Sequence, residues 1–298
     1  MDSKSMAAVP YPSSLEVAAN ANPDLLDTAL YYGLFREAES VRWKMSDIPF
    51  DAIEKDKAPP GLVELIRANA AAELTTWTAT NQFFQGFSDD VDFTQWMTVW
   101  LYEETKHPQA LMCWAKHFGE SFDTGFFLEG RKTYPFMNSK MGTLTFNILS
   151  EIEAATYYLS VSRNVQEPVL KLITKNLAAD EARHASSFYL YAKKRVTQSD
   201  NPQLERFEAL KMLYFWLVRH QNVQHPVALF ANKIARGGEF EGLDRIVGYN
   251  TENMHVRMRT MIGNLHRKSP MTRRPLRRMT RAICRRCHRK APRGITRR

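Results

Sequence analysis

The sequence has few of the residues that build strand-rich, disulfide-linked or membrane-spanning proteins. Only 3 of its 298 residues are cysteine, which excludes a disulfide framework and is typical of a reducing compartment. Glycine and proline, with 13 and 14 residues, are scarce relative to average composition, and clusters of turn residues are few. We therefore expect helices rather than a β-sandwich.

Long hydrophobic runs are missing as well. No stretch of 18 or more apolar residues occurs, and residues 1–19 contain no apolar segment behind a basic start. These absences predict a protein without a membrane span or a secretory signal. Together with the low cysteine count they predict a cytoplasmic location.

The positive charge is concentrated at one end of the chain. The net charge is +9, but residues 265–298 hold 14 of the lysines and arginines and no acidic residue. Residues 1–264 have 27 basic and 32 acidic side chains, a net charge of −5. We interpret 265–298 as a basic, disordered tail and the small, polar residues 1–22 as a flexible lead. Residues 23–264 are expected to form one folded domain.

Hydrophobic periodicity predicts helices through most of that domain. The expected helices cover residues 23–45, 62–87, 93–118, 138–164, 167–197 and 202–238, the last kinked or broken at Pro226, with a further helix over 240–266. Residues 119–137 have no period and are interpreted as a loop. The short link at Pro168 predicts that the two helices it joins pack antiparallel. The expected fold class is all-α.

Two of the expected helices carry the same motif. Glu104-Thr-Lys-His107 and Glu181-Ala-Arg-His184 each place a carboxylate and an imidazole three residues apart, on one face of a helix. An acid precedes each motif, and a basic residue precedes each histidine. A helix with Glu73 comes before the first motif, and a helix with Glu151 and Glu153 lies between the two.

This order supplies the donor set of a four-helix bundle that binds two metal ions. Such bundles take a Glu from each of two helices and a Glu-x-x-His from each of the others. Carboxylate and imidazole suit iron or manganese, and four carboxylates balance two divalent cations. Without metal, burying those charges would be costly. A third copy, Glu252-Asn-Met-His255, lacks the preceding acid and lies beside arginines, so we interpret it as a solvated helix face.

The two motifs and their surroundings resemble the soluble acyl-ACP desaturases, a family of ferritin-like di-iron enzymes. Trp100-Leu-Tyr-Glu-Glu-Thr-Lys-His107 is similar to that family's Trp-x-x-Glu-Glu-x-Arg-His helix. Ala179-Asp-Glu-Ala-Arg-His184 is similar to its Ala-Asp-Glu-x-Arg-His helix. The resemblance is best over residues 43–190. It implies a ferritin-like four-helix bundle with additional helices, a centre of two iron ions, and O2 as co-substrate.

The resemblance also implies the ligands. Glu153-Ala-Ala-Thr156 is similar to the family's Glu-Arg-Ala-Thr element, which favours Glu153 over Glu151 and places Thr156 as a catalytic residue beside the oxygen-binding face. The expected metal ligands are Glu73, Glu104, His107, Glu153, Glu181 and His184, with Glu151 as the alternative to Glu153.

An electron path is implied at the N-terminal end of the domain. Trp43-Lys-Met-Ser-Asp47 resembles the family's Trp-x-x-x-Asp element, whose tryptophan hydrogen-bonds the Asp of the second motif. Trp43, Asp180 and His184 are then expected to form the path, with Trp100 close by. A carboxylate on the outer ring nitrogen of a ligand histidine fixes its tautomer. The alternative is that Trp43 is a core aromatic residue and Asp180 a surface acid.

The function implied is an oxidoreductase of fatty acid metabolism that desaturates an acyl chain bound to an acyl carrier protein. A ferredoxin-like electron donor and a homodimer are implied with it, and the basic tail is suited to attract an acidic carrier protein. Ribonucleotide reductase small subunits carry a tyrosine at the position of Leu111, and arylamine N-oxygenases carry a histidine at the position of Leu177. This chain lacks both of those residues.

Two alternative functions stay open. One is a di-iron oxygenase that hydroxylates or N-oxygenates a small metabolite in a secondary pathway, with a pocket reshaped by Pro108, which interrupts its helix. The other is a non-catalytic ferritin-like scaffold that binds polyanions, including nucleic acid, through the tail.

Overall fold

Helices are the regular elements of the protein over the residues that a computed structural model describes, which are 28–132, 134, 137–236 and 242–266. They are α2 Leu30–Val41, α3 Leu62–Glu73, α4 Thr76–Gly86, α5 Val91–Lys116, α6 Thr124–Gly130, α7 Lys140–Asn164, α8 Pro168–Gln198, α9 Pro202–Arg219, α10 Pro226–Arg236, α11 Asp244–Val247 and α12 Thr251–Asn264. The all-α fold class is confirmed. The predicted lead 1–22 and nearly all of the tail lie outside the described residues.

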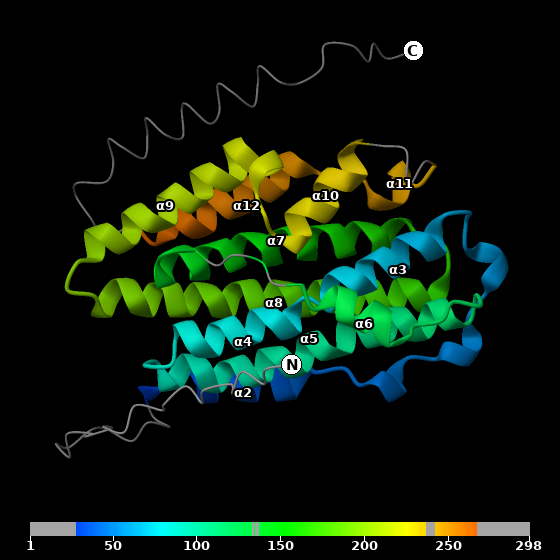
Figure 1. The fold of residues 1–298 in the computed structure, drawn as a ribbon, viewed down its shortest axis with the longest axis horizontal. Helices are drawn as coiled ribbons and strands as arrows, with labels where there is room; N and C mark the ends of the chain where they lie inside the picture. Colours follow the sequence, from blue (N-terminus) through cyan, green and yellow to red (C-terminus); the bar gives the residue numbers. More distant parts are fainter. Residues whose placement is uncertain (1–27, 133, 135–136, 237–241, 267–298) are drawn as a thin grey trace, which may run out of the picture.

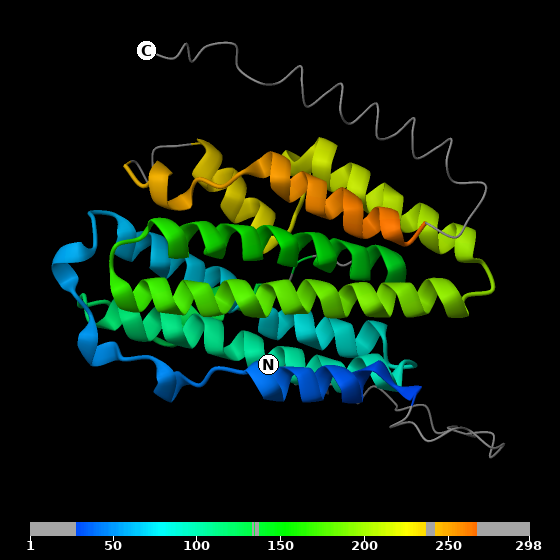
Figure 2. The same ribbon diagram turned by 180° about the vertical axis from the view of Figure 1, so that it is seen from behind.

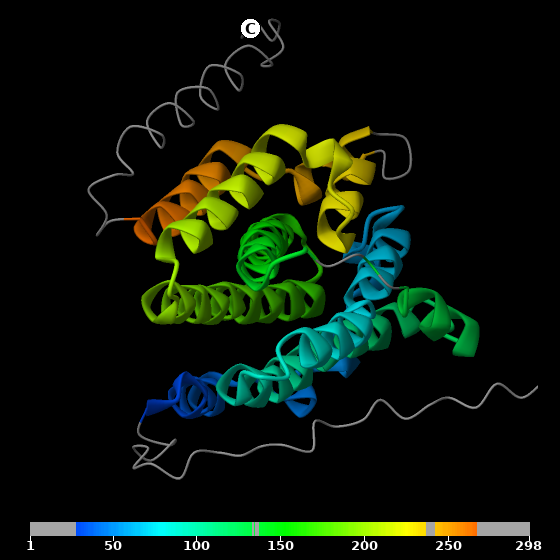
Figure 3. The same ribbon diagram turned by 60° about the vertical axis from the view of Figure 1, so that its left-hand side comes forward.

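Four long helical paths form a bundle, as Figures 1 and 2 show from opposite sides. They are α3 continued by α4, then α5, α7 and α8. The first path packs along α5, α7 packs antiparallel to α8, and α5 packs against α8. Helix α2 lies on the outside of α5, whereas α9, α10 and α12 cover α7 (Figure 3). This is the predicted ferritin-like bundle with additional helices.

Side-chain caps determine where the long helices begin. Asp90, Ser139 and Asn201 each accept a hydrogen bond from a backbone N–H in the first turn of α5, α7 and α9. Helix α8 begins at Pro168, and the carboxylate of Glu167 accepts from two backbone N–H groups of its first turn. The predicted starts of these helices agree with the structure because capping residues and prolines are visible in the sequence.

The helix predicted over 62–87 is in fact two helices. At Thr75 the backbone N–H donates to the carbonyl of Ala72, three residues back, so the last turn tightens. The hydroxyl of Thr75 donates to the same carbonyl. Helix α3 therefore ends at Glu73, and α4 begins at Thr76. The interruption falls at one of the predicted metal ligands.

The predictions for 119–137 and for the C-terminal third are also corrected. Residues 119–137 contain the short helix α6, which begins where the Asp123 side chain accepts from the Phe126 N–H. The helix predicted over 202–238 is divided into α9 and α10 by a 3-10 turn at His220–Asn222. The helix predicted over 240–266 is divided into α11 and α12. Pro226 does begin a new helix, as its missing N–H favours.

A close contact between α6 and the α3–α4 junction gives a test of this packing. A Cβ added at Gly130 would lie 2.3 Å from the Cβ of Leu74, whereas one added at Gly33 meets nothing within 4 Å. Gly130→Ala is expected to lower the free energy of unfolding by about 1–3 kcal/mol, because an overpacked contact forces a backbone shift. Gly33→Ala is the matched control and is expected to be neutral or stabilising. Equal denaturation midpoints for the two variants would contradict the packing.

The core has two apolar parts. One is rich in aromatic residues and includes Phe83, Phe93, Trp96, Trp100 and Phe188. The other, at the opposite end of the bundle, includes Leu65, Leu111, Trp114, Ile173 and Leu177. Along both α5 and α8, the motif residues fall between these two parts. Among the described residues, no helix is long and apolar enough to cross a membrane.

Candidate metal centre

Two groups of ligand-type side chains meet in the centre of the bundle. The first group is Glu73, Glu104, His107 and Glu181, and the second is Glu104, Glu151, Glu181 and His184. Within each group, one ligand atom from each residue lies within 4.8 Å of the others. Glu104 and Glu181 belong to both groups. Two ions bound by these groups would therefore share two carboxylates.

Both histidines turn the same ring nitrogen towards the carboxylates. The Nδ1 of His107 lies 3.4 Å from Glu181 Oε1 and 3.6 Å from Glu73 Oε2. The Nδ1 of His184 lies 2.9 Å from Glu104 Oε1 and 3.5 Å from Glu181 Oε2. These two nitrogens are thus the ligand atoms that the geometry offers, one in each group.

Unpaired buried atoms show that metal ions fit this donor set. Glu104 Oε1, Glu181 Oε2 and both Nδ1 atoms are buried and make no hydrogen bond of good geometry with the described residues, although Glu104 Oε1 lies 2.9 Å from His184 Nδ1. Burial, and after it the charge of Glu181, raises the pKa of Glu104 to about 7 and that of Glu151 well above its usual value. A buried polar atom without a partner is costly, and cations would supply partners while neutralising the carboxylates.

The acid before each motif holds the histidine of the other motif. The outer nitrogen of His107, Nε2, lies 3.3 Å from Asp180 Oδ2, and that of His184 lies 3.1 Å from Glu103 Oε2. One guanidinium nitrogen of Arg183 donates to both acids, at 2.7 Å each. The two helices are thereby connected by reciprocal contacts around the centre. Such partners orient ligand histidines and raise their basicity.

The structure contains the hydrogen bond expected between Trp43 and the second motif. Trp43 Nε1 donates to Asp180 Oδ2 at 2.8 Å, and Asp180 is only 1% exposed, so it is not a surface acid. The predicted third member is corrected, because Asp180 contacts His107 rather than His184. His184, four residues after Asp180 on α8, turns its ring towards the carboxylates of the centre. Asp180 instead contacts His107, which lies on the facing helix α5. Its role in electron transfer stays a prediction.

Glu153, which the resemblance favours over Glu151 as a ligand, lies outside both groups of ligand-type side chains. Glu153 lies on the other side of α7, where its carboxylate accepts from Trp216 Nε1 at 2.9 Å and from the Tyr249 hydroxyl at 3.0 Å, and lies 3.0 Å from His220 Nε2. Glu151, two residues earlier, points into the second group. Two residues are about 200° of rotation on a helix, so only one of these carboxylates faces the centre.

Thr156, predicted as a catalytic residue, is also displaced. Its hydroxyl donates to the carbonyl of Ile152 and lies 3.5 Å from Arg257 of α12, on the face of α7 that the C-terminal helices cover. The predictions for Glu153 and Thr156 came from the same four-residue element, so both residues are displaced together. The third copy of the motif stays apart from both groups, with Glu252 exposed at the start of α12.

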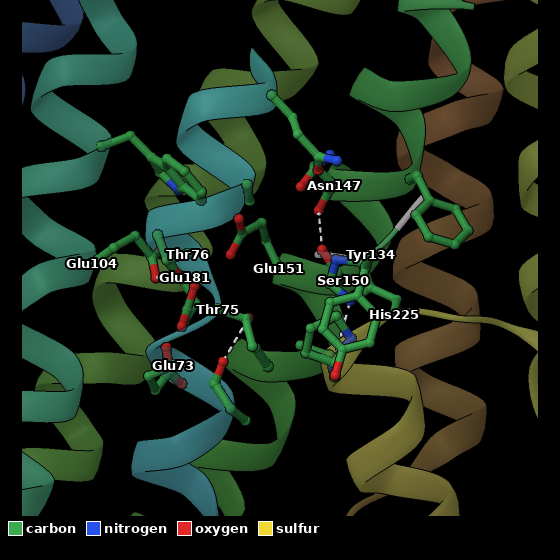
Figure 4. Close-up of a pocket in the computed structure, with 18 of the residues that line it drawn as sticks. Glu73, Thr75, Thr76, Glu104, Tyr134, Asn147, Ser150, Glu151, Glu181 and His225 are labelled. Carbon is green, nitrogen blue, oxygen red and sulfur yellow. Dashed lines mark hydrogen bonds between the residues drawn. The ribbon is translucent and has the colours of Figure 1, made fainter. Parts of the chain in front are cut away.

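A cavity of about 90 Å³ opens beside the ligands. In Figure 4 the carboxylates of Glu104, Glu151 and Glu181 form one side of it, and Asn147 and Ser150 of α7 face them together with Tyr134 and His225. Trp100, predicted near the electron path, lines this cavity instead, and its Nε1 makes no hydrogen bond with the described residues.

Two contacts to the ligands have no counterpart in the sequence predictions. The Thr76 hydroxyl donates to Glu104 Oε2 at 3.2 Å, and the Tyr158 hydroxyl donates to Glu73. Thr76 follows the break between α3 and α4, which the helical period does not reveal. Tyr158 is seven residues after Glu151, two turns along the same face of α7. A prediction that chose Glu151 as the ligand would have placed Tyr158 near the centre by this spacing.

The outer carboxylates lead to a prediction about metal affinity. Asp180→Asn is expected to weaken metal binding about 10- to 100-fold, as loss of such hydrogen-bond partners typically does. The dissociation constant for Fe(II), measured anaerobically by competition with a chelator, gives this ratio. Glu64→Gln, on the exposed side of α3, is the control and should bind metal as the unchanged chain does. Equal affinity in both variants would remove Asp180 from the site.

One known protein family matches a part of this chain. The sequence model of the Rubrerythrin family matches residues 142–256, from α7 to α12, which is less than half of the chain. The matched part contains Glu151 and the second motif but not the first. A comparison with curated proteins found no match. The match and the ligand geometry support a ferritin-like fold of the di-iron carboxylate type, and neither points to a particular substrate.

Proposed function

We propose that the protein is an O2-dependent di-iron oxidoreductase that oxygenates a small metabolite in the cavity beside Glu104, Glu151 and Glu181. The observation that carries this proposal is the pair of ligand groups that share two carboxylates and form a wall of that cavity. Two iron ions held there supply oxidising power from O2 and external electrons, while the chain supplies binding and orientation.

The residues around the ligands hold the carboxylates in place. Glu104 and Glu181 are 3% and 2% exposed, so bulk water does not compete for them. Thr76 holds one oxygen of Glu104, and Tyr158 holds Glu73. A site that is oriented in advance and shielded from water protects a reactive oxidant from side reactions.

The size of the cavity favours a small substrate over an acyl chain. The cavity volume of about 90 Å³ is well below the roughly 300–1,000 Å³ that is typical of sites for drug-sized ligands. A fatty acyl chain that passes the metals is much larger.

External electrons need a route to the buried centre. We infer that Trp43, Asp180 and His107 provide it, because they form a continuous chain of contacts from the edge of the bundle to a ligand. Trp43 is 8% exposed, and the ammonium of Lys106 lies 4.3 Å from the centre of its ring system. A ferredoxin-like protein is the proposed donor.

Desaturation of a carrier-bound acyl chain is the second candidate. It is favoured by the Trp43–Asp180 hydrogen bond, which resemblance to the desaturases implies and the structure contains. It requires an acyl carrier protein as partner, and a homodimer is proposed with it. The cavity would also have to open along the bundle to accept the chain. The polyanion-binding scaffold requires instead that the centre hold little metal.

Product analysis under 18O2 separates the two reactions. The iron-loaded protein is incubated with a chemical reductant and either a library of small organic acids, alcohols and amines or an acyl-loaded carrier protein. We expect a small product that contains one labelled oxygen atom. An acyl product that has lost two hydrogens and gained no label would establish desaturation and overturn the oxygenase proposal. Two bound irons with no product from either set would also contradict it.

A further inference from the structure

The cavity beside the ligands has a polar wall built by one helix. Thr143, Asn147 and Ser150 follow each other at intervals of four and three residues along α7, so they share one face. They are 4%, 8% and 3% exposed. The amide of Asn147 and the hydroxyl of Ser150 donate to the backbone carbonyls of Thr143 and Asn147, which offsets the cost of their burial.

One residue of the cavity wall, Trp100, contains a buried donor without an acceptor among the described residues. Trp100 is 3% exposed and lines the cavity, and its Nε1–H makes no hydrogen bond with any of the described residues. Trp100 lies one turn before Glu104 on α5, next to the ligands.

The charge of the cavity wall depends on its cations. The charges of Glu73, Glu104, Glu151 and Glu181 are balanced by two divalent ions. Burial lowers the pKa of His225 to about 4, so this residue is neutral at pH 7. Lys132 is then the remaining charged group among the described residues that line the cavity. The wall has a net charge of +1 once metal is bound.

Lys132 also has a defined place relative to the ligands. It follows α6 on the connection to α7 and is exposed to solvent, whereas the carboxylate ligands are buried. The exposed cation of Lys132 and the buried carboxylates therefore line the same cavity. A molecule with one negative end and one uncharged end complements this arrangement.

We propose that the cavity binds a small monocarboxylic acid, with its carboxylate at Lys132 and its uncharged body along Thr143, Asn147 and Ser150. The reacting end points to Glu104, Glu151 and Glu181. The inference rests on the proposed function, because bound metal is needed to neutralise the four ligand carboxylates. It narrows the substrate from any small metabolite to one chemical class. Benzoate is a small acid of this class and serves as the probe.

The test measures binding to the full chain loaded anaerobically with Fe(II). Titration calorimetry compares benzoate with benzamide, which has nearly the same shape and no charge, and with dodecanoate. We expect benzoate to bind at least roughly 5-fold more tightly than benzamide, the ratio expected for one partly exposed ion pair worth about 1 kcal/mol. Dodecanoate should bind no more tightly than benzoate, because a cavity of about 90 Å³ does not enclose its twelve-carbon chain.

Two matched variants assign the effect to one residue. Lys132→Met should weaken benzoate binding roughly 5-fold and leave benzamide binding unchanged. Arg131→Met is the control, because the Arg131 guanidinium stacks over the ring of Trp77 and Arg131 is not part of the cavity wall. It should leave both constants unchanged.

The outcomes separate this inference from the proposed function. Iron is counted in the same samples. If the chain holds two irons, three results overturn the carboxylate inference and leave the proposed function intact. They are equal binding of benzoate and benzamide, no effect of Lys132→Met on benzoate binding, and no benzoate binding at all. Tightest binding of dodecanoate overturns it in favour of an acyl chain. An iron content below one per chain overturns the proposed function, and the inference with it.

Discussion

Replacing Glu104 by alanine is expected to reduce bound iron from two ions per chain to fewer than one. Glu104 belongs to both ligand groups, so its loss removes a donor from each ion. It also leaves the charge of two divalent cations balanced by three carboxylates in a buried site, where uncompensated charge is costly. Iron per chain, measured by elemental analysis after anaerobic loading and desalting, gives the result.

Glu73→Ala is the control for this prediction. Glu73 belongs to one group only and is more exposed than the other ligands, so its loss is expected to leave about one iron per chain. Far-ultraviolet circular dichroism checks that both variants remain helical. Retention of two irons by Glu104→Ala, or the same content in the two variants, would show that Glu104 is not a shared ligand.

Glu151 and Glu153 are expected to respond to the same substitution in opposite ways. Glu151→Gln should lose the ion next to His184, because an amide is a poor substitute for a charged ligand, and should retain about one iron per chain. Glu153→Gln should retain two irons. It should instead lower the free energy of unfolding by about 1–3 kcal/mol, because the bonds from Trp216, Tyr249 and His220 to a carboxylate are weakened.

Iron content and denaturant unfolding of the two variants measure this pair of effects. The comparison is sharp because the substitutions are identical and only two residues apart on one helix. Loss of iron in Glu153→Gln with retention in Glu151→Gln would reverse the ligand assignment and support the sequence-based choice.

The fold and most residues of the candidate centre can be predicted from the sequence, because each long helix displays its own signals. Pro168 marks the start of α8, and Asp90 and Ser139 occupy capping positions that their residue types reveal. The motif at Glu104 and the one at Glu181 place two ligands on one helix face by spacing alone. Such signals are local, so one sequence is enough to find them.

The choice between Glu151 and Glu153 as a ligand, in contrast, does not follow from local sequence signals. Helix α7 is packed against α8 on one side and against α9 and α12 on the other, so nearly all of its residues are buried. A helix that is covered on all sides has no polar face, and its sequence does not show which side contacts the bundle centre. Glu153 is buried among donors from α9 and from the segment before α12, which lie more than 60 residues further along the chain.

The partners of the ligand histidines depend on tertiary geometry in the same way. Asp180 and His184 are neighbours on α8, and this proximity suggests a pair within one helix. The ring of His184 turns towards the centre, and its outer nitrogen contacts Glu103 of α5. The break between Glu73 and Thr76 also escapes the periodicity, because residues on both sides of it fit a helical pattern.

The position and number of bound ions test the central claim most directly. Crystals of the full chain, loaded anaerobically with Fe(II), are measured at the iron absorption edge. The anomalous difference map should show two peaks, both in contact with Glu104 and Glu181, one also with Glu73 and His107 and the other with Glu151 and His184. The absence of peaks, a single peak, or a peak bound by Glu153 would contradict a centre of two iron ions with these ligands.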